Sequence, residues 1–256
     1  IKQAVQKQIK AGRDPGTHGP IYLFVVTNAN DDGVGDGTVN TYRMLDALGQ
    51  ANTIPNVAKD ERADALTEQR RQLEGKLVAA IDSMPGPHDA SARAASRARQ
   101  QALQQQIAEV DQQIKDNHNG IVPSLDIEGL KVLVCSLVPP DTPAGHAWGY
   151  VYVHAKLMIV DDVFTILGSA NINTRSMEVD SELNICHEHS GVTRPLRQKL
   201  WDIHTGGLGA QKNVADAFKA WTEITNKNKA RQQGKLAPYA SLVGFMYTGK
   251  KRTRTD

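Results

Sequence analysis

The chain has 256 residues, of which 40% are hydrophobic and 23% are charged, and its formal net charge is +2. This composition is that of an ordinary globular protein and excludes wholesale disorder. The small positive charge gives no argument for a nucleic-acid partner, and no apolar run reaches the roughly twenty residues that span a bilayer. The chain does not begin with Met and its opening residues resemble no signal peptide, so we expect it to begin inside a longer polypeptide.

The first fifty residues predict the opening of an α/β layer. Residues 1–10 have the pattern of a short amphipathic helix, and residues 21–27 are a run of β-branched, aliphatic and aromatic residues typical of a buried strand. A polar, glycine-containing loop follows over residues 28–37, and then a helix over residues 38–48. A strand, a loop and a helix form half a unit of an α/β layer.

The loop after this strand partly resembles a calcium-binding loop. Asn28, Asn30, Asp32 and Gly33 follow the first positions of the pattern D-x-[DN]-x-[DN]-G. The twelfth position, however, holds Val39 instead of glutamate, and a strand precedes the loop where a helix is required. We therefore expect that no cofactor is required, with calcium at this loop as the alternative.

Between about residues 56 and 119 the pattern becomes that of two long helices. Apolar residues recur at helical spacing on both sides of the break at residues 85–87, with Arg, Gln, Glu and Lys between them. The recurring positions are Leu66, Leu73, Leu77 and Ile81, and then Ala98, Leu103, Ile107, Val110 and Ile114. This predicts an inserted antiparallel helical hairpin of coiled-coil type. It would connect two strands, and the functional alternatives are a docking surface for a partner and a lid over the site.

Strand patterns return after residue 121 and are followed by two helices. The order of these elements indicates an α/β fold. Cys135 and Cys186 lie in strand-like runs and are expected to be buried thiols, with a disulfide as the alternative. The expected strands are residues 130–137, 150–158, 163–167 and 182–186, and the expected helices are residues 195–204 and 213–225.

The most informative segment is residues 154–171, which reads HxKxxxxD and then GSxN. Residues two apart share one face of a strand, so His154 and Lys156 project together, and past the next strand Ser169 and Asn171 again lie two apart. Lysine supplies charge for an anionic phosphate, while serine and asparagine supply neutral donors. The imidazole can act as a nucleophile or carry a proton. The pattern predicts a site for a phosphate ester.

These residues resemble the HKD motif of the phospholipase D superfamily, over about thirty residues. Residues 152–162 are similar to the family's second HKD strand, residues 168–177 (GSANINTRSM) to its continuation, and residues 180–182 to its DSE segment. The resemblance implies an α/β/α sandwich with a mixed sheet. It also implies phosphodiester hydrolysis through a phosphohistidine, without an obligatory metal.

On this fold we expect four regions. Residues 1–54 would be the first part of the HKD α/β domain and residues 55–120 the helical hairpin insertion. Residues 121–248 would be the second part of the domain, with the catalytic motif, and residues 249–256 a basic tail.

The resemblance also implies roles for the site residues. His154 would be the general acid and then the general base, with nucleophile as the alternative. Lys156 and Asn171 would bind phosphate oxygens, with Ser169 as a further donor. Asp161 would act structurally, by holding the strand turn or Lys156. In addition, Glu182 would accept a hydrogen bond from an imidazole and set its tautomer.

The predicted active site is incomplete, because the chain contains a single HxKxxxxD. Hydrolysis through a phosphohistidine divides the work between two imidazoles in opposite protonation states. Members of the superfamily supply the second motif from a second copy of the chain or from the same chain. The opening of this chain and its DSE segment resemble the second half of the larger type. We expect a missing N-terminal HKD half, with a one-motif homodimer as the alternative.

The GSANIN-x-RSM and DSE segments are closer to the lipid-cleaving members than to the small nucleases. Trp148, Tyr150 and Tyr152 precede His154, where aromatic rings could meet an acyl interface, with plain strand packing as the alternative. We expect hydrolysis and transphosphatidylation of phospholipid headgroup esters. The alternatives are an HKD nuclease, for which the basic residues 250–254 are the only argument, and a catalytically idle binding module.

The long insertion and the loop over residues 27–37 resemble bacterial effector phospholipases delivered by type VI secretion. This resemblance implies a secreted or delivered toxin that acts on a membrane surface. An immunity or delivery protein would then be a partner, and nucleic acid is not expected to be one.

Overall fold

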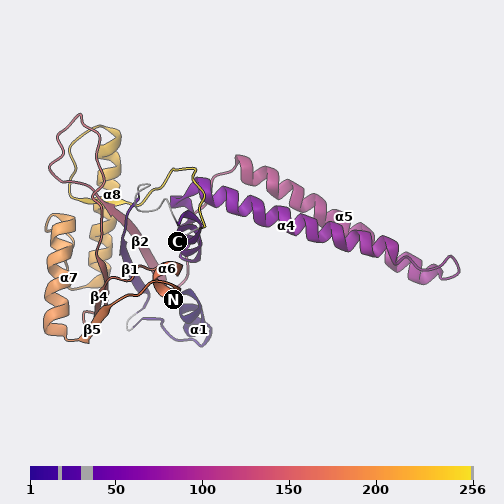
Figure 1. The fold of residues 1–256 in the computed structure, drawn as a ribbon, viewed down its shortest axis with the longest axis horizontal. Coiled ribbons are helices and arrows are strands. Elements are labelled where there is room, and N and C mark those ends of the chain that lie inside the picture. Colours follow the sequence, from indigo (N-terminus) through magenta and orange to yellow (C-terminus); the bar gives the residue numbers. More distant parts are fainter. Residues whose placement is uncertain (17–18, 30–36, 255–256) are drawn as a thin grey trace.

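The computed structural model describes residues 1–16, 19–29 and 37–254. Figure 1 shows a mixed α/β body from which two long helices project as a single arm. The expectation of an α/β fold is therefore confirmed at the level of class. Among the described residues, no helix has the length and apolar character needed to cross a membrane.

A three-stranded sheet forms the centre of the body. Strand β1 (Ile21–Val26) pairs in parallel with β2 (Leu130–Leu137), and β2 pairs antiparallel with β6 (Leu242–Gly244). The two longer strands lie where the runs of β-branched and aliphatic residues predict them. The third strand is only three residues long, which is too short for its pattern to stand out from the loops around it.

Helices cover both faces of this first sheet. Neighbouring residues of a strand point to opposite faces, so Val134 and Cys135 enter different hydrophobic clusters. Val134 packs with Leu45 of α3 (Thr38–Ala47), near the short 3₁₀ turn η1 (Ala51–Thr53). Cys135 packs with Trp221 and Ile224 of α8 (Val214–Gln233). Trp221 is fully buried, and its indole N–H donates to the carbonyl of Gly209 at 2.9 Å.

A second sheet carries the predicted motif. Strands β3 (Lys156–Val160), β4 (Phe164–Gly168) and β5 (Asn184–Glu188) pair antiparallel in this order. Helix α7 (Ser190–Thr205) joins this sheet through a hydrogen bond of 2.7 Å between the hydroxyls of Thr193 and Thr165, both buried. The short helix α6 (Thr174–Glu178), which the sequence pattern did not predict, lies in the connection between β4 and β5.

A single mixed sheet was expected, whereas the described strands fall into two separate sheets. The reason lies in the segment between β2 and β3. Residues 150–155, expected as part of a strand, form no ladder; the Val151 N–H donates to the Leu137 carbonyl at 2.8 Å as an isolated contact. The mixed character is present in the first sheet alone, which contains both parallel and antiparallel pairs.

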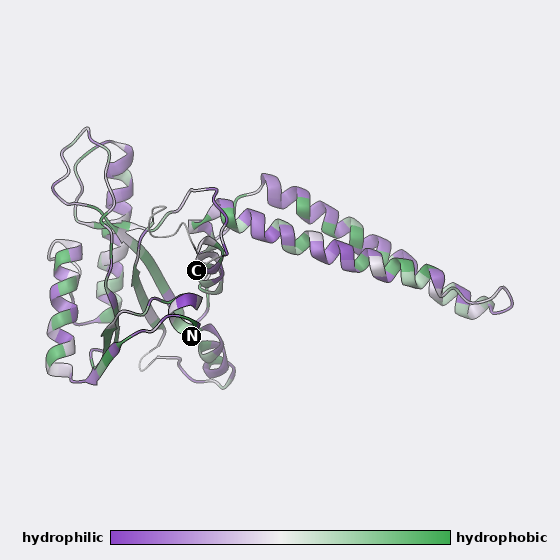
Figure 2. Ribbon diagram, in the orientation of Figure 1, coloured by the Kyte–Doolittle hydropathy of each residue, from purple (hydrophilic) through white to green (hydrophobic). Residues whose placement is uncertain are grey.

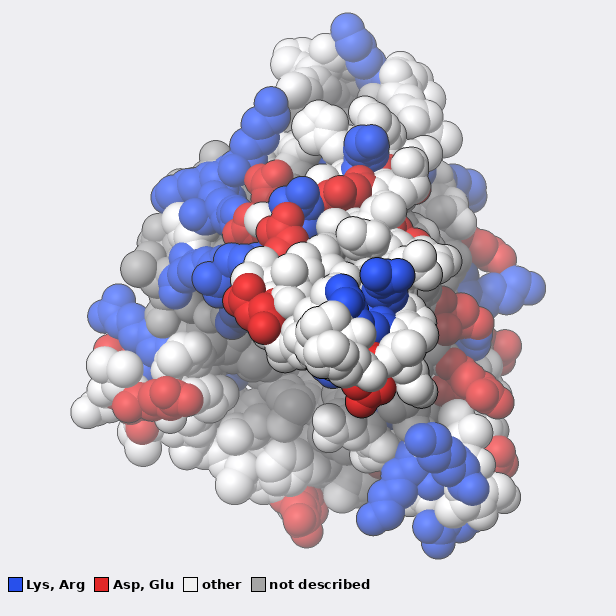
Figure 3. All heavy atoms as spheres, turned by 90° about the vertical axis from the view of Figure 1, so that its right-hand side faces the viewer, with Lys and Arg blue, Asp and Glu red and all other residues white. Residues whose placement is uncertain are grey.

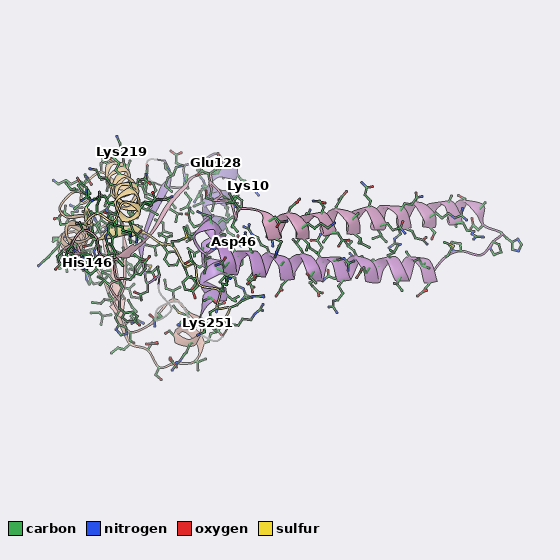
Figure 4. All side chains as sticks on the ribbon, turned by 90° about the horizontal axis from the view of Figure 1, so that it is seen from above. Lys10, Asp46, Glu128, His146, Lys219 and Lys251 are labelled. Atoms are coloured by element: carbon green, nitrogen blue, oxygen red, sulfur yellow. The ribbon has the colours of Figure 1, made fainter. Side chains whose placement is uncertain are left out.

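The arm consists of α4 (Pro55–Asp82) and α5 (Ala90–Asn119). The two helices run antiparallel: Asn117 donates to the Lys59 carbonyl at 2.8 Å near the body, and Gln100 donates to the Ala80 carbonyl at 3.0 Å near the tip. Leu73, Ala80, Leu103 and Val110 form a small buried core between them. Figure 4 shows the helices facing each other along the arm.

The remaining elements differ from expectation mainly at their ends. Helix α1 (Lys2–Lys10) buries Val5 and lies in the predicted range. Helix α7 begins at Ser190, five residues before the predicted start, and keeps Pro195 inside it; α8 continues eight residues past the predicted end at Thr225. Cys135 is buried as expected, but Cys186 is exposed, and both thiols are free.

The C-terminal segment lies against the root of the arm, although basic tails of this kind are generally solvated. The Tyr247 N–H donates to the Thr53 carbonyl at 2.9 Å, and Arg252 Nε donates to Glu61 Oε1 at 2.6 Å. Arg252 also pairs with Asp64, and this contact lowers the pKa of the Asp64 carboxyl.

Candidate active site

The β3–β4 hairpin fixes the position of the predicted lysine relative to the GSxN segment. Lys156 lies directly opposite Gly168 in the ladder, so its side chain starts next to Ser169. The turn between the strands contains Asp161 and Asp162, with φ angles of 53° and 57°. Two successive left-handed residues match the right-handed twist of the flanking strands, and aspartate tolerates this conformation better than most residues.

Ser169 and Glu182 form the tightest polar contact at the site. The Ser169 hydroxyl donates to Glu182 Oε2 at 2.5 Å, and it accepts the Leu183 N–H at 3.0 Å. The hydrogen bonds from Ser169 and then Ser176 lower the pKa of Glu182, and the charges of Lys156 and Arg175 act in the same direction. The structure therefore brings Lys156, Ser169 and Glu182 together, and Glu182 remains a carboxylate near neutral pH.

Gly168 allows this close approach. A Cβ atom at this position would collide with Asn184 Oδ1 and with the Leu183 carbonyl oxygen. The end of β4 and the start of β5 could not pack at this distance with any larger residue. The glycine of the GSxN pattern thus has a steric cause in the structure.

His154 lies just before β3 and is exposed. Its ring stacks on Tyr152, with centroids 6.0 Å apart and planes at 24°. Its carbonyl accepts a hydrogen bond from Lys156 Nζ at 2.8 Å. Asn171 is exposed in the loop after β4. Within the described part of the chain, neither the His154 ring nor the Asn171 amide bonds to the Lys156, Ser169 and Glu182 group.

The side chain that holds the hairpin turn is that of Asp162, not Asp161. Arg197 of α7 donates from Nε and Nη2 to the two carboxylate oxygens of Asp162, at 2.6 and 2.7 Å. Arg197 is buried, and its guanidinium lies 4.5 Å from the ring centroid of Trp201. Asp161 contributes its backbone conformation to the turn, while Lys156 bonds to His154 instead of Asp161.

Sequence reasoning missed Asp162 and Arg197 as residues that support the site. One signal was present: arginine and tryptophan four residues apart on a helix lie on the same face, which here turns toward the hairpin. The acidic partner, however, lies 35 residues earlier in the chain.

The three aromatic rings before His154 are not equivalent. Trp148 is buried, packs with Val138 and Val243, and donates its indole N–H to the Leu236 carbonyl at 3.0 Å. Tyr150 and Tyr152 remain partly exposed, and partial burial raises the pKa of Tyr150. Plain packing, which was the alternative for these rings, accounts for Trp148.

The calcium expectation falls mostly outside the described residues, because Asn30, Asp32 and Gly33 are not among them. Asn28 is described, and its amide oxygen accepts the Val153 N–H at 2.7 Å. No cluster of His, Cys, Asp or Glu side chains suited to a metal occurs in residues 1–16, 19–29 and 37–254.

The Lys156 ammonium, the Glu182 carboxylate and the exposed His154 imidazole together form a class of site that can bind an anionic ester. Comparison with known proteins agrees with this class. Residues 146–229 match the family model for phospholipase D. That region is therefore similar to the phospholipase D family.

Three plant proteins illustrate the similarity. The chain is 48% identical over 64 residues to phospholipase D alpha 4 of Arabidopsis thaliana. It is 44% identical over 71 residues to phospholipase D alpha 2 of Oryza sativa subsp. japonica, and 46% identical over 70 residues to phospholipase D alpha 1 of Spuriopimpinella brachycarpa. These matches cover 22–23% of this chain and only 8–9% of the length of each relative. No solved structure gives a match.

Proposed function

We propose that this chain supplies one half of the active site of a phospholipase D-type enzyme that hydrolyses headgroup phosphodiesters of phospholipids. The observation that carries the proposal is the group formed by Lys156, Ser169 and Glu182 beside His154, within the region that matches the phospholipase D family model. Transfer of the phosphatidyl group to a small alcohol follows from the same chemistry, since an alcohol can replace water in the second step.

In this proposal His154 moves the proton. One imidazole attacks phosphorus and forms a nitrogen–phosphorus bond, while the second imidazole protonates the leaving alkoxide as the phosphorus–oxygen bond breaks. The second imidazole then takes a proton from water, which displaces the histidine and restores both rings. We assign His154 to the acid and base role, and its exposed ring leaves it accessible to a substrate.

The hydrogen bonds of the site refine the roles of the other residues. A serine hydroxyl has one proton to donate, and that of Ser169 is donated to Glu182. Lys156 and Asn171 are therefore the donors that remain for the phosphate oxygens, and Ser169 holds the carboxylate. Glu182 would in turn accept a hydrogen bond from the imidazole of the missing half, since carboxylates commonly orient histidine rings in this way.

The exposed apolar residues around the site support a missing half. Ile172, Leu183 and Ile185 are 84%, 78% and 65% exposed, and β3–β5 carry further exposed aliphatic side chains. Figure 2 shows hydrophobic stretches in this sheet beside α7, along which hydrophobic and hydrophilic residues alternate. Apolar surface of this kind marks an interface. We propose that a second HKD unit covers it, supplied by the same polypeptide or by a second copy, and completes the α/β/α sandwich.

Lipid is the favoured substrate for two reasons. The curated relatives named above are all phospholipases D. The argument for a nuclease was the basic tail, and its Arg252 and Arg254 pair with Glu61 at the root of the arm. Figure 3 shows basic and acidic side chains interspersed on the face that bears the arm, without a broad basic surface. Delivery as a bacterial effector, with an immunity or delivery protein as partner, belongs to the same proposal and is supported by the resemblance alone.

The test uses the complete protein from which this chain comes. It is incubated separately with phosphatidylcholine vesicles and with plasmid DNA, and release of choline and nicking of DNA are measured. We expect choline release, and a loss of about 10³-fold or more in the His154→Ala variant with the fold intact. The matched control, His88→Ala, removes an imidazole at the tip of the arm and should leave the rate unchanged. Cleavage of DNA alone, or near-normal turnover of His154→Ala, would contradict the proposal.

A further inference from the structure

The segment that carries His154 is tied to the first sheet by one side chain. Asn28 lies two residues past the end of β1 and 125 residues before Val153. Its amide nitrogen donates to the Val153 carbonyl at 3.0 Å, and its amide oxygen accepts the Val153 N–H at 2.7 Å. Both backbone groups of the residue that precedes His154 are thereby paired with a single carboxamide.

A carboxamide is suited to this contact because it carries a donor and an acceptor side by side, as a peptide group does. Asn28 therefore takes the place of a neighbouring strand where no ladder forms. Residues 150–155 are otherwise linked to β2 by the Val151 N–H to the Leu137 carbonyl. A buried or half-buried backbone group without a hydrogen-bond partner is unfavourable, so the two hydrogen bonds from Asn28 stabilise this position of Val153.

The backbone next to Asn28 is fixed by hydrogen bonds to β2. The residue before it, Thr27, donates its N–H to the Cys135 carbonyl at 2.9 Å. The Thr27 carbonyl accepts the hydroxyl proton of the buried Ser136 at 2.7 Å. The position of the Asn28 side chain is thus set by the β1–β2 pair, which belongs to the covered first sheet.

This contact determines which way His154 points. Alternate residues of an extended segment point to opposite sides. Val153 turns inward and packs against the cluster that contains Cys135 and Trp221. Tyr152 and His154 consequently turn outward together, where their rings stack. A segment rotated about its axis would bring Val153 out of the core and turn the His154 ring to the opposite side.

We propose that Asn28 is a positioning residue for catalysis: its carboxamide locks the backbone of Val153, and this lock sets the direction of the His154 imidazole. The inference rests on the proposed function of His154, and it assigns Asn28 to the reaction through geometry, without contact between Asn28 and substrate.

The experiment compares three variants of the complete protein. Asn28→Ala removes the carboxamide, and Asn28→Leu removes both hydrogen bonds while keeping a similar side-chain shape. Asn56→Ala is the matched control, because Asn56 also donates to a main-chain carbonyl, that of Thr248 at 2.7 Å, but at the root of the arm. For each variant, thermal unfolding, hydrogen–deuterium exchange of the peptide containing Val153, and steady-state kinetics are measured. The substrates are phosphatidylcholine vesicles and bis(p-nitrophenyl) phosphate, a simple phosphodiester.

In both Asn28 variants the Val153 amide should exchange at least about tenfold faster than in the parent protein. Their kcat should fall by about 10- to 100-fold with KM changed less than about twofold, because misplacement by about 1 Å is enough for such a loss. Asn56→Ala should match the parent protein in both measurements.

The inference is overturned if Val153 exchanges at the parental rate in both Asn28 variants, or if faster exchange leaves kcat unchanged. A parent protein that cleaves the simple phosphodiester but no lipid contradicts the proposed substrate alone; the exchange rates and kcat of the variants still decide the role of Asn28.

Discussion

The two sheets of this chain differ in how completely they are covered. The β1–β2–β6 sheet lies between α8 on one face and α3 with the root of α4 on the other, and its neighbours Trp221 and Leu45 are fully buried. The β3–β4–β5 sheet touches α7 near Thr165, while Met158 and Ile185 stay exposed. The sheet that carries the motif is the one with the weaker core.

The two sheets are therefore stabilised in different ways. The first sheet has helices on both faces and can hold its own structure through burial, at roughly 25 cal/mol per Å² of apolar surface. Polar contacts anchor the second sheet, Arg197 with Asp162 and Thr193 with Thr165, and a third, Asn28 with Val153, anchors the segment that leads into it. Polar anchors fix positions well but leave apolar surface free, as a site completed by another unit requires.

The largest expected effect on the free energy of unfolding comes from removing a core side chain of the first sheet. Trp221→Ala should lower the free energy of unfolding by about 3–5 kcal/mol, because it leaves a large cavity in the first sheet and an unpaired Gly209 carbonyl. Ile185→Ala, at an exposed position of the second sheet, should cost less than about 0.5 kcal/mol. Urea unfolding followed by circular dichroism measures both. Equal costs would mean that the second sheet has a core of its own.

A smaller effect tests the polar anchor of the second sheet. Asp162→Asn keeps a residue that tolerates positive φ but removes the charge opposite buried Arg197, and it should cost about 2–3 kcal/mol. The matched variant, Asp180→Asn, breaks the ion pair with Arg175, whose side chain is largely exposed, and should cost less than about 1 kcal/mol. Amide exchange in β4 should rise in the first variant only. If Asp180→Asn destabilises the protein as much, burial of Arg197 is not what gives the anchor its strength.

The smallest effect concerns the dependence of stability on pH. His204 packs edge-on against Trp221 beside the first sheet, and burial lowers its pKa below the ordinary value of 6.5. The unfolded chain therefore binds a proton at a higher pH than the folded chain does. The stability from the neutral ring is complete above about pH 6.5 and is lost as the pH falls through the lower, folded pKa. The unfolding temperature should therefore fall as the pH is lowered from about 7.5 to about 5, the range in which histidine titrates. His204→Leu should flatten this dependence, and an unchanged slope in that variant would refute the assignment.

The fold was predictable where a local pattern decides the structure. β2 lies over the expected residues 130–137, and β1 ends one residue before its expected end, because their runs of Val, Ile, Leu and Phe suit a buried strand and little else. The apolar spacing in α4 and α5 likewise reflects the packing of one helix on the other. Residues 150–155 alternate as a strand does, but a strand also needs a neighbour in register, and this is not encoded in the segment itself.

The site was predictable to the extent that the motif is contiguous. Lys156 and Ser169 come near each other because a three-residue turn joins their strands, and Glu182 follows within a short connection. Asn28 and Arg197 could not be found from spacing, because their partners lie 125 and 35 residues away. The preference of Asn28 for a backbone partner becomes visible only when the end of β1 and the segment before β3 are placed side by side.

The arm also bears on the order in which the chain folds. β1 and β2 are parallel neighbours, yet the whole of α4 and α5 lies between them in the sequence. The contact between Asn117 and Lys59 brings the two ends of the arm together. A hairpin made of local contacts forms early, and once formed it roughly halves the length of chain that must close before the two strands pair. Each halving lowers the entropic cost of closure by about 0.6 kcal/mol. The arm thus shortens the length of chain that must close before β1 and β2 pair.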